Sequence, residues 1–173
     1  MRPAYSIEIL NLNRAFRINE KFLKKIVLEI LAYIKKTGSV EIEIVFLDDR
    51  AIRVFNKKYK GRNASTDVLS FKLGVAEFGR RPSASLGTSP EIVEGRRFLG
   101  EILISSETAF ANSKVFGTEF YEELVLYVIH GILHLFGYDD KSAKDKIKMS
   151  KEEEKLLGFL CKRQKLSEVL TPR

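Results

Sequence analysis

The stretch TEFYEELVLYVIHGILHLF, residues 118–136, predicts more about the fold than any other part of the chain. Apolar residues fall on nearly every side of a helix drawn over it, which is typical of a helix in the protein interior. Thr118 would begin this helix with an incomplete capping box, because Tyr121 rather than Glu or Gln stands three residues later. Acidic residues occupy the first turn, where the helix dipole favours them, and Gly137 provides a stop. We therefore expect a central, buried helix over 118–136.

Strand and helix patterns alternate around this helix. Period-two alternation predicts strands over 5–10, 40–47, 67–73 and 98–105, and a period of 3.6 predicts helices over 19–36, 107–116 and 147–163, with a short helix after Asp48. Residues 74–97 are rich in Gly, Ser and Pro and show no sustained period, so we expect an irregular excursion there. This order predicts an α+β fold in which a single small mixed β-sheet of about four strands is covered by about five or six helices, with a metal site at the central helix.

Length and composition bound the class of protein. The 173 residues suit one domain over 1–173, and 45% hydrophobic with 31% charged residues is the balance of a globular chain. No apolar run reaches the roughly 18 residues that span a membrane, and residues 1–9 lack the apolar core of a secretory signal. Cys161 is the single cysteine, so no internal disulfide can form. We expect a cytoplasmic protein without a membrane partner.

The formal net charge of +7 points to an anionic partner. Nucleic acid is the commonest large polyanion of the cytoplasm, but a basic surface that only aids solubility explains the charge equally well. Charge alone therefore does not decide between these two explanations, and the residues of the candidate site must.

The two histidines of the chain, His130 and His134, lie four residues apart on the predicted central helix. Residues at this spacing share one helix face, and imidazole nitrogen is a favoured ligand of zinc and related divalent ions. Gly137 can take the left-handed conformation that reverses the chain and brings Asp140 back as a third ligand. The spacing matches the extended zinc-protease pattern, with Asp140 where a third histidine would stand. Three protein ligands leave a coordination position open, as in catalytic zinc sites.

The residue after His130 bears on the reaction. The metalloprotease helix carries a glutamate there as general base, and this chain has Gly131, so peptide hydrolysis by that mechanism is not expected. We hypothesise that Gly131 opens space beside the ion for a bulkier substrate backbone. The alternative to a metal site is that both histidines are ordinary packing residues; the glycine turn and the carboxylates that follow favour the metal.

The run His130-Gly-Ile-Leu-His-Leu-Phe-Gly-Tyr-Asp-Asp140 closely resembles the signature of the bacterial YbeY family of rRNA maturation factors, which are metal-dependent endoribonucleases. The runs 65–71 and 99–105 resemble the family's strands on either side of its variable loop, so the similarity covers most of 56–140. The resemblance implies cleavage of single-stranded RNA, a role in ribosomal RNA maturation and ribosome quality control, and one divalent metal ion, with zinc favoured.

Two positions depart from the family's usual pattern. The third histidine is Asp140 here, which keeps a ligand and changes its charge. Where the family usually has an arginine in the loop before Thr66, this chain has Lys60, with Arg62 two residues on, and we expect Lys60 and Arg62 to offset charge on the phosphate as catalytic residues.

Ser105, at a strand end, is a candidate substrate contact, although a serine there is more often a helix cap.

Two other functions fit the same residues. One is metal-dependent hydrolysis of an amide or ester bond, and the other is a ribosome-associated RNA-binding protein whose metal is structural. A structural ion would be needed for folding, whereas a catalytic ion could be removed with the fold largely kept.

Overall fold

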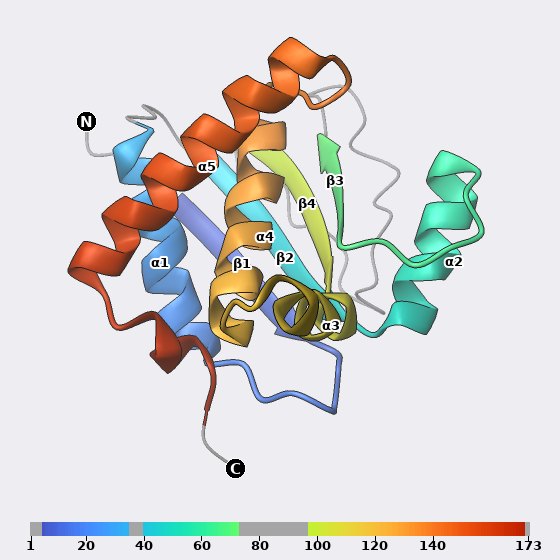
Figure 1. Ribbon diagram of the computed structural model, residues 1–173, viewed down its shortest axis with the longest axis horizontal. Helices are drawn as coiled ribbons and strands as arrows, with labels where there is room; N and C mark the ends of the chain where they lie inside the picture. Colours follow the sequence, from blue (N-terminus) through green and yellow to red (C-terminus); the bar gives the residue numbers. More distant parts are fainter. Residues whose placement is uncertain (1–4, 35–39, 73–96, 172–173) are drawn as a thin grey trace.

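A four-stranded mixed sheet forms the middle layer of the protein (Figure 1). The structure is a computed structural model that describes residues 5–34, 40–72 and 97–171. The strands are β1 (Tyr5–Asn11), β2 (Val40–Leu47), β3 (Val68–Lys72) and β4 (Arg97–Ser105), in the order β1-β2-β4-β3. β1, β2 and β4 run parallel, and β3 is antiparallel to β4. The predicted mixed sheet is confirmed.

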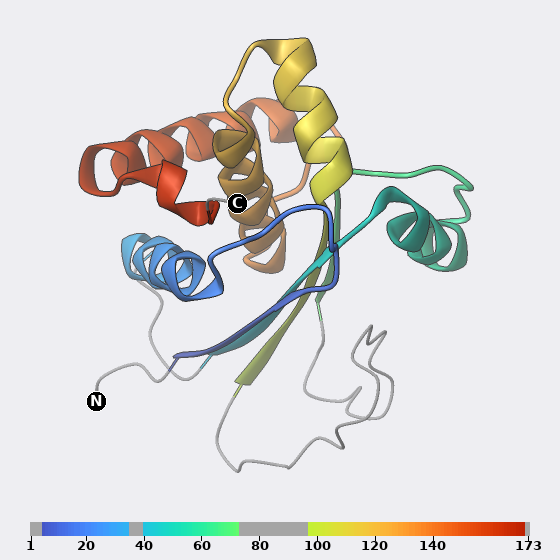
Figure 2. The ribbon, with the colours of Figure 1, turned by 90° about the horizontal axis from the view of Figure 1, so that it is seen from below.

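Five α-helices and one short 3-10 helix surround the sheet within the described residues. They are α1 (Glu20–Tyr33), α2 (Asp49–Lys60), α3 (Ser106–Phe116), α4 (Phe120–Leu135), α5 (Ala143–Arg163) and the 3-10 helix Leu166–Val169. α5 packs along α4 and α1, while α2 lies apart from them at the other side of the molecule (Figures 1 and 2). The predicted α+β class is therefore confirmed. None of the helices in the described ranges is long and apolar enough to cross a membrane.

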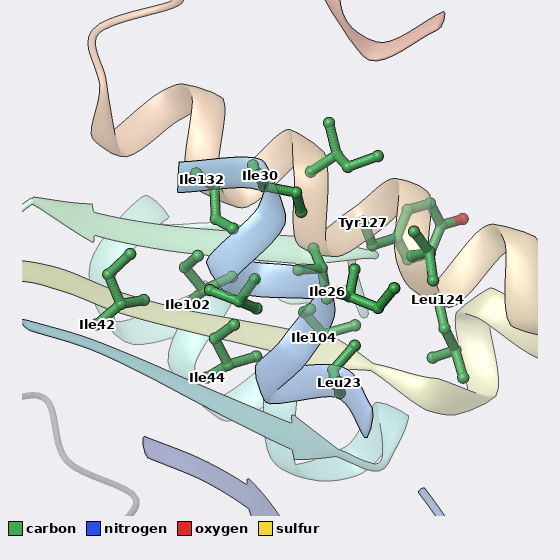
Figure 3. Packing of buried hydrophobic residues seen from close by; sticks show 14 of the residues in the cluster. Leu23, Ile26, Ile30, Ile42, Ile44, Ile102, Ile104, Leu124, Tyr127 and Ile132 are labelled. Carbon is green, nitrogen blue, oxygen red and sulfur yellow. The ribbon is translucent and has the colours of Figure 1, made fainter. Parts of the chain in front are cut away.

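Each face of the sheet has its own core, because side chains of a strand point alternately to opposite faces. The larger core joins β2 and β4 to α1 and α4 (Figure 3), and it includes the buried side chains Leu23, Ile26, Ile30, Ile42, Ile44, Ile102, Ile104, Leu124, Tyr127 and Ile132. The smaller core contains Val45, Leu47, Ile52, Leu69 and Leu103. Since Ile52 belongs to α2, this helix covers the opposite face of the sheet from α4.

The predicted central helix is confirmed as α4, most of whose side chains are buried. Its N-cap is Glu119 rather than Thr118, and Glu122 completes a capping box by accepting from the Glu119 N–H at 3.3 Å. The Thr118 hydroxyl instead donates to the Glu123 carboxylate at 2.7 Å. The helix is thus better capped than its sequence suggested, because the box lies one residue further along.

Two other predicted boundaries differ from the structure. α5 begins at Ala143 rather than at Ile147, since Ser142 caps it by accepting from the Asp145 N–H at 3.1 Å. Of the predicted irregular excursion over 74–97, Arg97 belongs to β4, and the rest lies outside the described residues. A single domain over 1–173 stays a prediction.

Gly100 lets three elements meet closely. Its φ is 154°, and a Cβ at this position would lie 2.1 Å from the carbonyl oxygen of Phe71 in β3 and 2.6 Å from the side chain of Leu135 in α4. The register of β4 against β2 also shifts beside Gly100, between Glu41 and Ile42. The absence of a side chain therefore sets how closely β3 and the end of α4 approach β4.

Gly100→Ala is expected to lower the free energy of unfolding by roughly 2–4 kcal/mol, because the methyl group meets a backbone carbonyl and the residue keeps a strained φ. Urea denaturation followed by circular dichroism measures the change. Gly158→Ala in α5 is the control, since an added Cβ there has nothing within 4 Å. The control should leave stability unchanged or raise it by up to about 1 kcal/mol. Parental stability of Gly100→Ala would contradict the packing role of Gly100.

Candidate metal centre

His130 and His134 lie one turn apart near the C-terminal end of α4, as their spacing predicts. Their rings meet edge to face, with centroids 4.5 Å apart and planes at 80°. The two Nε2 atoms are 3.0 Å apart. Both imidazoles therefore point at one spot.

The chain turns back after α4 and brings Asp140 to the histidines. Gly137 has a φ of 91°, in the left-handed region that glycine tolerates, and its N–H donates to the His134 carbonyl at 3.0 Å. His130, His134 and Asp140 then offer one ligand atom each, and these atoms all lie within 4.8 Å of one another. The turn that the sequence predicted thus assembles a group that can bind a metal ion.

Each imidazole is held from behind at its Nδ1 atom. The carboxylate of Glu153, on α5, lies 2.6 Å from Nδ1 of His130, and the carbonyl of Tyr138 lies 3.0 Å from Nδ1 of His134. Metal-binding histidines usually have such a partner, which orients the ring and raises the basicity of the other nitrogen. Sequence reasoning missed both partners, because the contact with Glu153 depends on how α5 crosses α4.

These hydrogen bonds determine which ring nitrogen carries the proton. A carbonyl can only accept, so Nδ1 of His134 is the donor to Tyr138, and the carboxylate of Glu153 likewise accepts from His130. In the neutral rings both Nε2 atoms then face each other as lone-pair acceptors at 3.0 Å. A shared cation removes their repulsion, and two nitrogen ligands of tetrahedral zinc lie about 3.3 Å apart at ordinary bond lengths. The donor set of two imidazoles and one carboxylate therefore fits a divalent metal ion.

The two rings have opposite pKa shifts. Burial lowers the pKa of His130, but the hydrogen bond and charge of Glu153 outweigh burial, so its pKa is raised overall. Burial also lowers the pKa of His134, and the charge of His130 lowers it further. His134 thus favours the neutral form that a metal ligand requires.

A cleft of about 730 Å³ reaches the centre. Its lining includes all three candidate ligands, together with Lys60 and Arg62, so the structure brings five of the six predicted site residues to one hollow. Asp67 and Asp139 also line the cleft, although Asp139 pairs with Lys141 at 3.1 Å rather than joining the ligand group. Within the described residues, the cleft therefore brings together a group that can bind a metal ion and two cations without an ion-pair partner.

The turn after α2 positions Lys60 and Arg62. Gly61 ends α2 in the left-handed conformation with a φ of 71°. The buried Asn56 holds the turn from inside: its side-chain amide donates to the Ala64 carbonyl at 2.8 Å, and its backbone carbonyl accepts from the Arg62 N–H at 3.3 Å. The backbone of this turn is thus fixed while the side chains of Lys60 and Arg62 are exposed.

Ser105 occupies the helix-cap position that the sequence offered as an alternative. Its side chain is fully buried, accepts from the Thr108 N–H at 3.1 Å and donates to the carboxylate of Asp49. It is not among the residues that line the cleft within the described part of the chain. Ser105 therefore joins α3 to α2 in this structure.

Gly131 allows α4 to pack closely against β4 and does not open the space beside the candidate ligands. A Cβ at this position would lie 2.5 Å from Cγ2 of Ile102 in β4, so this face of α4 points at the sheet. The hypothesis that Gly131 opens space beside the ion is wrong, because Ile102 fills the space that it leaves.

Comparisons with known proteins find a matching family and similar sequences. The family described as endoribonuclease YbeY matches residues 8–160. The endoribonuclease YbeY of Clostridium botulinum (strain 657 / Type Ba4) is 36% identical over 159 residues, which cover 87% of this chain and 95% of the relative. That of Thermodesulfovibrio yellowstonii is 31% identical over 169 residues, covering 90% and 97%.

A solved structure is also similar. The solution structure of TM1509 from Thermotoga maritima has a TM-score of 0.54 and 27% sequence identity, and the match covers 90% of this chain and 92% of that one. The match with the family over residues 8–160 includes the helix that carries both histidines and most of α5. The chain belongs to the endoribonuclease YbeY family.

Proposed function

We propose that this protein is a metal-dependent endoribonuclease that cleaves single-stranded RNA and acts in ribosomal RNA maturation and ribosome quality control. The relatives described above are named endoribonucleases. The observation that carries the proposal is the single cleft lined by His130, His134 and Asp140 together with Lys60 and Arg62. We further propose a cytoplasmic location, where this RNA is found.

In the proposed site, Nε2 of His130, Nε2 of His134 and the carboxylate of Asp140 hold one divalent ion, with zinc favoured. Such an ion supplies Lewis-acid stabilisation of the charge on a phosphoryl oxygen. Glu153 and the Tyr138 carbonyl keep the rings in the tautomer that presents Nε2 to the cleft. The protein thus presents its ligands already oriented before a substrate arrives.

Lys60 and Arg62 are proposed to bind the phosphate and to offset charge that develops on it during cleavage. Arg62 can form paired hydrogen bonds with two phosphate oxygens, whereas Lys60 acts as a point charge. In the described part of the chain, neither side chain pairs with a carboxylate. Both cations therefore reach the phosphate without first breaking an ion pair.

The first prediction for the proposed function concerns the metal ligands. Zinc-loaded protein is expected to cleave single-stranded RNA, whereas chelation or His134→Ala should reduce cleavage by at least about a hundredfold, because the ion is lost. A gel assay on labelled RNA measures the rate, and elemental analysis of untagged protein measures the metal. Circular dichroism after chelation should show the fold largely kept.

Other outcomes of this experiment separate the alternatives. Unfolding on chelation would support a structural ion and an RNA-binding protein. Hydrolysis of peptides or esters with RNA left intact would support an amide or ester hydrolase. Equal cleavage by His134→Ala and the parent would end the catalytic proposal.

The second prediction concerns the partner of His130. Glu153→Gln is expected to weaken zinc binding by about 10–100-fold, because an amide neither orients the ring as firmly nor raises its basicity. Competition with a chromogenic chelator measures the affinity without any activity assay. Glu154→Gln is the matched control, since Glu154 is the exposed neighbour on the same helix. Similar affinities for both variants would refute the positioning role of Glu153.

The third prediction separates the two cations. Arg62→Lys keeps the charge and removes the guanidinium fork, so it should lower kcat for RNA cleavage by about 10-fold or more if Arg62 contacts the phosphate in two places. Lys60→Arg should keep most of the activity, because a point charge is retained. Single-turnover cleavage at saturating protein measures both. The reverse ranking would assign the main phosphate contact to Lys60.

A further inference from the structure

A second group of basic side chains lies outside the metal cleft, on the outer face of α2. A hollow of about 790 Å³ follows this face and is lined by Arg50, Arg53, Val54, Lys57, Lys58 and Asn63. All four cations in this group are exposed. We call Arg50, Arg53, Lys57 and Lys58 the α2 basic face.

The cations of the α2 basic face form no ion pair within the residues that the structure describes. The single acid within α2, Asp49, is only partly exposed, and its carboxylate accepts from the hydroxyls of Ser105 and Thr108. Asp48, just before the helix, accepts from the Ala51 N–H at 2.7 Å. The two acids are thus occupied in holding the helix start, and the outer face stays positive.

Helix stability accounts for only part of this charge. Lys57 and Lys58 lie in the last turn of α2, where the negative end of the helix dipole favours cations. Arg50 lies in the first turn, where the same dipole disfavours a cation. Val54, on the same face, is 62% exposed and so contributes little to the core. An anionic partner for this face explains the position of Arg50, which the stability of the helix does not.

The α2 basic face is continuous with the metal cleft. Asn63 lines the outer hollow, while its neighbours Arg62 and Ala64 line the cleft. Arg53 also reaches across to this turn, because its Nε donates to the Asn63 side chain at 3.0 Å. Cations therefore follow one another from Arg50 along α2 to the turn that carries Arg62.

We propose that the α2 basic face binds the sugar-phosphate backbone of RNA that flanks the segment in the cleft. This proposal rests on the proposed function and adds to it a second contact with the same single-stranded substrate. The four cations of the α2 basic face are spread along about two turns of helix. Such a row suits successive phosphates of one strand rather than a single small anion. The face increases affinity for long RNA and takes no part in the chemistry, so a short RNA that fills only the cleft does not use it.

The test compares two sets of charge removals. Arg50→Gln, Lys57→Gln and Lys58→Gln together remove three cations from the α2 basic face and leave the contact of Arg53 with the turn at Asn63 in place. Lys21→Gln, Lys24→Gln and Lys25→Gln together remove three exposed cations from α1, which lies on the other side of the molecule (Figure 1). All six side chains are exposed, so both variants should fold, and thermal unfolding checks this.

Fluorescence anisotropy with single-stranded RNAs of about 20 and about 5 nucleotides measures binding. Three lost phosphate contacts should make the negative slope of log K against log salt shallower by about 2, and should weaken binding of the long RNA by about tenfold or more at low salt. Binding and cleavage of the short RNA should stay at the parental level. The α1 variant should bind both RNAs like the parent.

Three results would overturn the proposal. Parental affinity of the α2 variant for long RNA would exclude the contact. An equal loss of affinity in the α1 variant would show that the effect comes from net charge and not from a contact at the α2 basic face. Parental RNA binding combined with loss of ribosome co-sedimentation would assign the face to an acidic protein. Because anisotropy needs no turnover, the contact with RNA is tested even if the parent fails to cleave, which would instead contradict the proposed function.

Discussion

The candidate metal centre depends on holding two imidazole nitrogens face to face, with Nε2 of His130 and Nε2 of His134 only 3.0 Å apart. Two neutral rings would not keep this arrangement unaided, since both lone pairs point into the same space. It persists because the helix fixes the spacing of the rings, while Glu153 and the Tyr138 carbonyl hold them from behind. Two further segments complete the centre: α5 carries Glu153, and the turn at Gly137 brings Asp140 back to the two rings.

The same arrangement requires α4 to lie close to the sheet. Gly131 of α4 and Gly100 of β4 have no side chain where the two elements meet, so Ile102 and Leu135 occupy that space. Because these two glycines have no side chain, the end of α4 lies next to β3, whose residues form part of the cleft wall. Close packing therefore does more than stabilise the core, because it places the candidate metal ligands beside the strand that lines the cleft.

Local patterns in the sequence predict what depends on near neighbours. Each predicted strand ends within one residue of its observed bounds, and the His130 and His134 pair follows directly from helical spacing. Contacts between distant segments could not be predicted: Glu153 lies 23 residues from His130 and meets it only because α5 crosses α4. Gly131 shows the same difference, since sequence placed it beside the ion and the structure turns it towards Ile102. Periodicity defines the faces of a helix but not which neighbour each face meets.

Asp140 changes the charge balance of the centre, and the rest of the cleft is suited to that change. Under the proposed function, a carboxylate in place of a third imidazole would lower the positive charge of a metal-loaded centre by about one unit, so that such a centre would attract a phosphate less strongly. Lys60 and Arg62 line the same cleft and can restore part of this attraction. Screening at physiological salt acts over about 8 Å, so cations elsewhere on the surface contribute little to a phosphate at the metal. For the proposed function, the turn that Asn56 holds in place would therefore matter more to a phosphate in the cleft than the net charge of the whole chain, because this turn determines which cations lie close to the centre.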